Sequence, residues 1–165
     1  MLRRLQPTDA EAYFALRRAA LLDAPLAFGA APEDDVASSP EAVRGLLARG
    51  DDNAVFGALD GAELVGAVGI FREHHRKAAH KARIWGMYVV PAQRGRGLAQ
   101  ALLAAAIQHA RDLGGIAWVH LSVTSAAPAA RHVYQQAGFR LWGTETDALR
   151  CNGESADEHH LALRL

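Results

Sequence analysis

The chain has 165 residues, half of them hydrophobic and 22% charged, which is the balance of one folded globular domain rather than of a disordered or fibrous protein. The 18 Lys and Arg residues equal the 18 Asp and Glu residues in number, so the net charge gives no reason to expect nucleic acid or a membrane as a partner. A single cysteine, the lack of a membrane-length apolar run and an N-terminus without a signal-peptide core lead us to expect one cytoplasmic domain over residues 1–165.

The N-terminal part of the chain predicts two helices separated by a loop. The first helix begins at Thr8 or Asp9, either of which can cap it, and ends before Pro25. We expect its apolar side to consist of Ala12, Leu16, Ala19 and Ala20. After a loop over residues 26–35, a second helix is expected to begin at Ser39, with Pro40 at its first position, and to end at Gly50.

Three consecutive strands follow, and we expect them to be antiparallel. The apolar runs at residues 54–59 and 63–71 flank Asp60-Gly61, a pair that supplies the positive φ angles of a tight hairpin turn. A polar loop with three histidines, residues 72–80, leads to a strand at residues 82–90, which Pro91 stops.

The rest of the chain predicts two helices and three strands. Residues 98–113 have the strongest helical pattern, and Gly114 and Gly115 end it. The remaining elements are expected as a strand at residues 116–123, a helix at 128–137, and closing strands at 139–143 and 158–165.

The stretch QRGRGLAQ, residues 93–100, joins a strand to this helix and has the composition of an anion site. Gly95 and Gly97 have no Cβ, so the backbone can approach a ligand closely. The first amides of the helix lack intrahelical partners, and Arg94 and Arg96 add positive charge beside them. We therefore expect this turn to bind a phosphate or a pyrophosphate.

Three phosphate-binding motifs can be compared with this stretch. A P-loop sequence is absent, and the dinucleotide fingerprint fails because Gln100 stands in place of its third glycine. The pattern Arg/Gln-x-x-Gly-x-Gly/Ala is satisfied by Arg94, Gly97 and Ala99. Through this pattern the chain resembles the GCN5-related N-acetyltransferase (GNAT) family, whose cofactor is acetyl-CoA.

The resemblance covers most of the chain. The run Tyr88-Val89-Val90-Pro91 is similar to the strand end that precedes the loop in that family. The family's tyrosine segment is matched by Ala130, Val133, Tyr134, Gly138 and Phe139, while Ala127 replaces an asparagine that often contacts the cofactor. The resemblance implies an α+β fold with a central, mostly antiparallel, twisted sheet of six to seven strands, flanked by helices and splayed at the acetyl-CoA site.

The resemblance also implies roles for particular residues. Acetyl-CoA would be bound as co-substrate by Tyr88, Val89 and Val90 at the strand end and by Arg94, Gly95, Arg96, Gly97, Leu98 and Ala99 in the loop. Tyr134 would give the departing CoA thiolate its proton, because a phenol with an ordinary pKa of about 10 is protonated at neutral pH. The implied reaction is direct acetyl transfer to a primary amine of a small molecule or peptide in a ternary complex.

The sequence does not single out a general base. In the branch of the family that acetylates ribosomal-protein N-termini, a glutamate lies twelve residues before the tyrosine, where this chain has Ser122, which cannot act as a base. Candidate bases are Glu33 in the early loop and Glu73, His75 and His80 around the loop before the third strand. For each of them we favour the interpretation as a solvated polar residue, and a chain of waters can take the proton instead. These histidines lack zinc-site spacing, so we expect no metal.

The resemblance places the acceptor pocket around residues 22–35 and, as a second contribution, 144–157. Phe28, Glu33, Asp34 and Asp35 would give it an apolar wall with an acidic rim that suits a cationic amine, although a solvated surface loop fits the same residues. Two functions of other classes stay open, a non-catalytic acyl-CoA-binding or sensor module and an unrelated nucleotide-binding protein. A homodimer formed through the closing strands also stays open.

Overall fold

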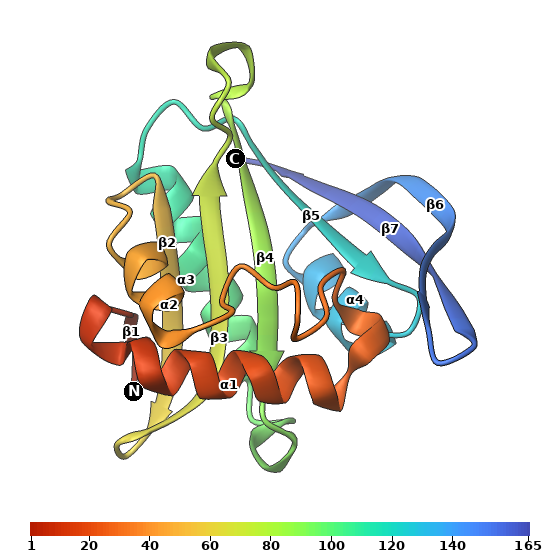
Figure 1. Cartoon of the computed structure of the whole chain (residues 1–165). Coiled ribbons are helices and arrows are strands. Elements are labelled where there is room, and N and C mark those ends of the chain that lie inside the picture. Colours follow the sequence, from red (N-terminus) through yellow and green to blue (C-terminus); the bar gives the residue numbers. More distant parts are fainter.

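The computed structural model describes residues 1–165 and contains one seven-stranded sheet in the order β1-β2-β3-β4-β5-β7-β6 (Figure 1). The strands are β1 Leu2–Arg4, β2 Asn53–Asp60, β3 Glu63–Arg72, β4 Lys81–Val89, β5 Trp118–Thr124, β6 Arg140–Cys151 and β7 Glu154–Arg164. The α-helices are α1 Ala10–Asp23, α2 Pro40–Leu47, α3 Leu98–Asp112 and α4 Pro128–Gln136. Four 3-10 turns lie at Pro7–Asp9, Pro25–Ala27, Arg76–Ala78 and Pro91–Gln93. The predicted α+β architecture of helices flanking a mostly antiparallel sheet is confirmed.

The predicted β2–β3 hairpin is confirmed. Asp60 pairs with Glu63, and Gly61 in the turn has a φ of 59°, which a residue without a Cβ adopts freely. The edge strand β1, which pairs antiparallel with β2, was not predicted. Its three residues are too few to show a strand's alternation, and two of them are arginines.

The buried side of α1 differs from the predicted one. Leu16 and Ala20 are buried as expected, but Ala12 and Ala19 face solvent. Tyr13 and Arg17 take their places in the interior, together with Ala10 and Leu21. Small alanines fit either environment, so their spacing did not identify the side that packs. The second helix begins as predicted, because Ser39 Oγ accepts a hydrogen bond from the Ala42 amide at 3.1 Å.

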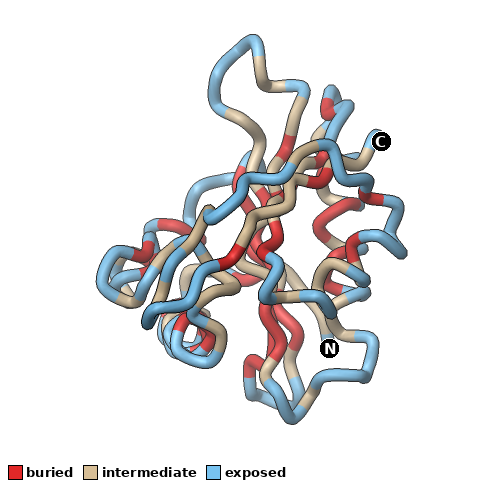
Figure 2. Tube along the Cα trace, turned by 90° about the vertical axis from the view of Figure 1, so that its right-hand side faces the viewer, coloured by how far each residue is buried: buried red, intermediate tan, exposed pale blue.

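The sheet separates two hydrophobic clusters. One cluster packs α3 against the central strands and includes Tyr134 and Phe139 from the α4 segment. The other packs α1 and α2 against the opposite face and includes Tyr13 and Tyr88. In Figure 1 these two helices lie in front of the strands and α3 behind them. Figure 2 shows that the buried residues gather in the central strands and in the helices beside them, while the connecting loops are exposed.

Strands β4 and β5 diverge, which agrees with the splayed sheet that the family resemblance implies. They pair in parallel only from Lys81 with Trp118 to Arg83 with His120, after which β5 continues beside β7. Where they separate, β4 carries an extra residue relative to β3, and Gly86 there has a φ of 64°. This β-bulge turns β4 away from β5 and opens a wedge between them (Figure 1).

The two closing strands are much longer than predicted. The expected strands at 139–143 and 158–165 become β6 and β7, which extend to a turn at Asn152-Gly153, where both residues have positive φ angles. The polar residues 144–157 lack the apolar alternation of a half-buried strand, so the sequence does not predict that they continue the two strands. Strand β5 begins at Trp118 rather than at 116. No helix is long and apolar enough to span a membrane.

Candidate functional site

The glycine-arginine loop lies between the end of β4 and the first turn of α3. Gly95 and Gly97 have φ angles of 76° and 78°, in the left-handed region that glycine adopts without strain. A Cβ at either position would meet no atom within 4 Å, so the space beside the loop is open. The loop is exposed, and Gly97 directly precedes a 15-residue helix whose first amides face this space. The geometry fits a diphosphate held by backbone N–H groups.

The two arginines of the loop have different surroundings. Arg94 donates from Nε to the Val89 carbonyl at 2.9 Å and from a terminal nitrogen to Asp23 Oδ2 at 2.6 Å. The Tyr88 hydroxyl donates to the same Asp23 oxygen at 3.2 Å, and hydrogen bonding from Arg94 holds the pKa of Asp23 below its ordinary value. Arg94 therefore ties the loop to the end of α1, whereas Arg96 forms no ion pair and is the cation available to a ligand.

Tyr134 is buried on α4, with 5% of its surface exposed, and belongs to the cluster that also contains Val89. Its ring packs against Phe139 with a centroid distance of 6.1 Å, and its hydroxyl forms no hydrogen bond with another protein group. Burial raises the pKa of Tyr134 well above the ordinary 10.0 of a phenol. The side chain is therefore protonated at neutral pH.

Ser122 has a partner that the sequence did not reveal. It lies on β5 two residues beyond the last β4–β5 pair, on the wedge between the two strands. Its Oγ is 2.9 Å from Nδ1 of His160 on β7, and Nε2 of that histidine is 3.9 Å from a carboxylate oxygen of Glu145. Glu145, Glu158 and His160 form a group in which the carboxylate oxygens and the imidazole nitrogen lie within 4.8 Å of one another. A hydroxyl, an imidazole and a carboxylate in this order can accept and pass on a proton.

The two segments predicted to form the acceptor pocket do lie together. They enclose an open cavity of about 340 Å³ between the end of α1, the loop after it and the β6–β7 turn. Phe28 and Glu33 line it from one side, and Leu149, Cys151 and Asn152 line it from the other.

The predicted acidic rim is reduced to Glu33. Asp34 accepts a hydrogen bond from the Ala31 amide, which closes the loop on itself, and does not line the cavity. Asp35 is buried in a bidentate ion pair with Arg17. Sequence alone gave no sign of this pair, because an arginine on a helix and an acid in a loop are both normally solvent-exposed.

The candidate bases around the third loop lie away from the site. Glu73, His75 and His80 precede β4, whereas Val89 and the glycine loop follow it, and nine residues of strand span about 26 Å. In Figure 1 the two loops occupy opposite ends of the sheet. Glu73 pairs with Arg83 at 3.2 Å, and His75 and His80 are exposed. The structure brings none of the three near Tyr134 or the loop.

Comparisons with known proteins agree with the fold and with the family resemblance. The model of the acetyltransferase (GNAT) family matches residues 14–139. A mycothiol acetyltransferase from Nocardiopsis dassonvillei is 42% identical over 62 residues, which are 36% of this chain but only 18% of that protein. The crystal structure of a GNAT-family acetyltransferase from Streptococcus pneumoniae superposes with a TM-score of 0.87 at 22% identity, covering 100% of this chain and 99% of that one. A phosphinothricin acetyltransferase from Sinorhizobium meliloti, solved with acetyl-CoA, gives 0.84 at 21% identity and covers 100% and 88%.

Proposed function

Because the match extends over most of its length, the chain belongs to the GNAT family of acetyltransferases, and we propose that it transfers an acetyl group from acetyl-CoA to a primary amine. The acceptor in this proposal is a small molecule or a peptide, and transfer is direct. The observation that carries the proposal is the wedge between β4 and β5, with the glycine loop at one end and Tyr134 beside it. A thioester placed in the wedge would present its acyl group between the strands.

The chain offers a suitable place for each part of acetyl-CoA. The open loop at Gly95 and Gly97, the first amides of α3 and Arg96 would hold the diphosphate. Backbone groups of β4 freed by the divergence from β5 would hold the pantetheine arm along Tyr88, Val89 and Val90. Bound there, acetyl-CoA supplies an activated acyl group in the form of a thioester.

The side chains divide the proton transfers between them. A carbon–nitrogen bond forms as the carbon–sulfur bond breaks, so the amine loses a proton and the departing sulfur gains one. Tyr134 holds the proton for the sulfur, because a phenol is protonated at neutral pH. His160 is the base in this proposal: Ser122 relays the amine proton to its Nδ1, and Glu145 faces the far nitrogen of that ring.

The first experiment measures release of CoA thiol from acetyl-CoA with a pool of primary amines. Tyr134→Phe keeps the ring contact with Phe139 and removes the proton, so kcat should fall about 100-fold or more. The Kd of acetyl-CoA, measured by calorimetry, should stay the same. A variant with wild-type kcat would overturn the role of Tyr134. Acetyl-CoA binding without turnover in any amine pool would favour the non-catalytic sensor instead.

A second experiment tests the proton path. His160→Gln should lower kcat/KM about 100-fold near neutral pH, because the serine loses its proton acceptor. The deficit should shrink as the pH rises toward the pKa of the acceptor amine, since more of the amine then arrives neutral. His159→Gln is the matched control, because that ring contacts Thr144 instead of Ser122. Equal effects of the two substitutions would remove His160 from the path.

A further inference from the structure

A buried polar cluster lies between α1 and the bulge of β4. Arg17 donates to both carboxylate oxygens of Asp35, from Nε at 3.0 Å and from a terminal nitrogen at 2.8 Å. The two side chains are only 8% and 3% exposed. The carboxylate occupies one edge of the guanidinium and leaves the other terminal nitrogen, Nη1, facing away from it.

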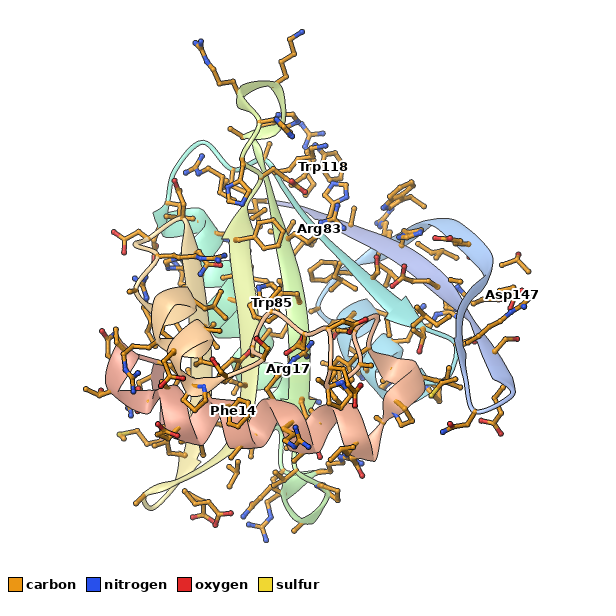
Figure 3. The ribbon with its side chains drawn as sticks, viewed as in Figure 1. Phe14, Arg17, Arg83, Trp85, Trp118 and Asp147 are labelled. Carbon is orange, nitrogen blue, oxygen red and sulfur yellow. The ribbon has the colours of Figure 1, made fainter.

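Three donors in this region have no acceptor. Arg17 Nη1, the Tyr13 hydroxyl and Trp85 Nε1 are all buried and form no hydrogen bond. An arginine nitrogen and an indole nitrogen can only donate, so neither can satisfy the other. Buried donors without partners are rare in folded proteins, because each loses its hydration without compensation. The Tyr13 hydroxyl can also accept, but no hydrogen bond joins it to either nitrogen, so all three donors are left without an acceptor. Figure 3 shows Arg17 and Trp85 between α1 and the sheet.

Two of these donors meet at the point where β4 leaves β5. A Cβ built on Gly86 would lie 3.5 Å from Arg17 Nη1 and 3.8 Å from the Tyr13 hydroxyl. Gly86 is the positive-φ residue of the bulge, and the wedge opens at this level. If the proposed function is right, the amine must meet the acyl group at this place.

One aromatic ring contacts both the cluster and the acceptor cavity. The Arg17 guanidinium carbon lies 4.9 Å from the centroid of the Phe28 ring, and Phe28 also lines the cavity of about 340 Å³. Gly29 follows it, and a Cβ there would meet no atom within 4 Å. Phe28 is therefore in contact with both the cavity and the cluster.

We propose that the acceptor is an amine that also carries a carboxylate, and that Arg17 Nη1 and the Tyr13 hydroxyl bind the carboxylate. This inference rests on the proposed function and adds the substrate class to it. A carboxylate supplies acceptor oxygens for these donors, and its bond to a guanidinium is charge-assisted. In an α-amino acid the amine is two bonds from the carboxyl carbon, so the same binding mode holds the nucleophile beside the bulge. Arg17 and Tyr13 are specificity-determining residues in this scheme.

The test compares matched acceptors. α-Amino acids and the amines left after their decarboxylation are assayed by thiol release with acetyl-CoA. The amino acid should be preferred in kcat/KM by about tenfold or more, the worth of one hydrogen bond between charged groups. Arg17→Lys keeps a cation opposite Asp35 but has no second donor edge, so the preference should drop toward one. Arg44→Lys, at an exposed arginine of α2, should leave the preference unchanged.

Tyr13→Phe separates a binding role from a structural one. It removes a hydroxyl that has no partner in the chain, so the free protein should be at least as stable to urea as the wild type. The KM for the amino acid should nevertheless rise about fivefold or more, while that for acetyl-CoA stays constant.

Two results would overturn the inference while the proposed function stands. One is equal use of the decarboxylated amines, and the other is an unchanged acceptor KM in both variants, which would mean that a buried water satisfies the donors. If no amine releases thiol, the proposed function fails, and calorimetry of amino acids with the CoA-loaded protein decides the inference separately. Heat from the amino acid and none from its matched amine would support the carboxylate site, and no heat from either would refute it.

Discussion

Replacing Asp35 by alanine should destabilise the protein severely. The carboxylate makes two hydrogen bonds to Arg17 and a third, at 3.2 Å, with the Ala37 amide, in a place where the side chains are almost fully buried. Its removal leaves a guanidinium charge without a partner in the interior, which costs about 3–5 kcal/mol. A domain of this size has a total stability of about 5–15 kcal/mol. Asp35→Ala should therefore lower Tm by about 6–20 °C.

Urea unfolding of three variants tests this reasoning. The double variant Arg17→Met/Asp35→Ala removes both charges and should recover most of the loss, because an apolar pair of similar volume replaces a buried ion pair at little cost. Asp51→Ala breaks a pair whose acid is 81% exposed and should cost less than about 1 kcal/mol. If Asp35→Ala loses no more free energy of unfolding than Asp51→Ala, the buried-pair argument is refuted.

Gly69→Ala should lower the free energy of unfolding in urea by about 1–3 kcal/mol, because the new Cβ would lie 2.2 Å from the indole of Trp85. In the control Gly45→Ala, inside α2, the Cβ meets no atom within 4 Å, so this change should be neutral or stabilising. Equal changes in the free energy of unfolding would contradict the steric account. Arg96→Ala should weaken acetyl-CoA binding about tenfold in calorimetry at low salt and make the remaining affinity less salt-dependent; an unchanged Kd would exclude Arg96 from the diphosphate site. The free energy of unfolding should fall as the pH drops below 6.5, the ordinary pKa of histidine. Burial holds the pKa of His120 below that value, so the unfolded chain binds the proton more readily than the folded protein does. The urea midpoint of His120→Gln should fall less over the same pH range than that of the wild type, and parallel curves would assign the effect to other groups.

Local signals in the sequence predicted most of the elements. The Asp-Gly pair at Gly61 predicts a turn and the two glycines after α3 predict a helix end, and each of these glycines has the positive φ angle that this requires. The apolar run of α3 likewise begins at Leu98 and keeps its helical period. These features depend on a few consecutive residues, so they can be read without knowledge of distant parts of the chain.

The candidate site was predictable only where it is local. The glycine loop and Tyr134 occupy fixed positions in short motifs, whereas other site residues have hydrogen-bond partners that are distant in the sequence. Arg94 reaches Asp23 across 71 residues, and Ser122 reaches His160 across 38. Neither pair leaves a pattern in the sequence, because the partners meet only when strands and helices pack.

The sequence by itself determined where the chain turns, which segments are helical and which short stretch has the composition of an anion site, since each follows from the backbone freedom and polarity of neighbouring residues. Only the tertiary structure decided which polar groups are buried away from solvent and which partners they find. It buried Arg17 with Asp35, gave Ser122 an imidazole partner and kept His75 and His80 a strand's length from Tyr134. Burial and pairing are properties of the packed whole, because each side chain's surroundings are supplied by residues far away in the chain.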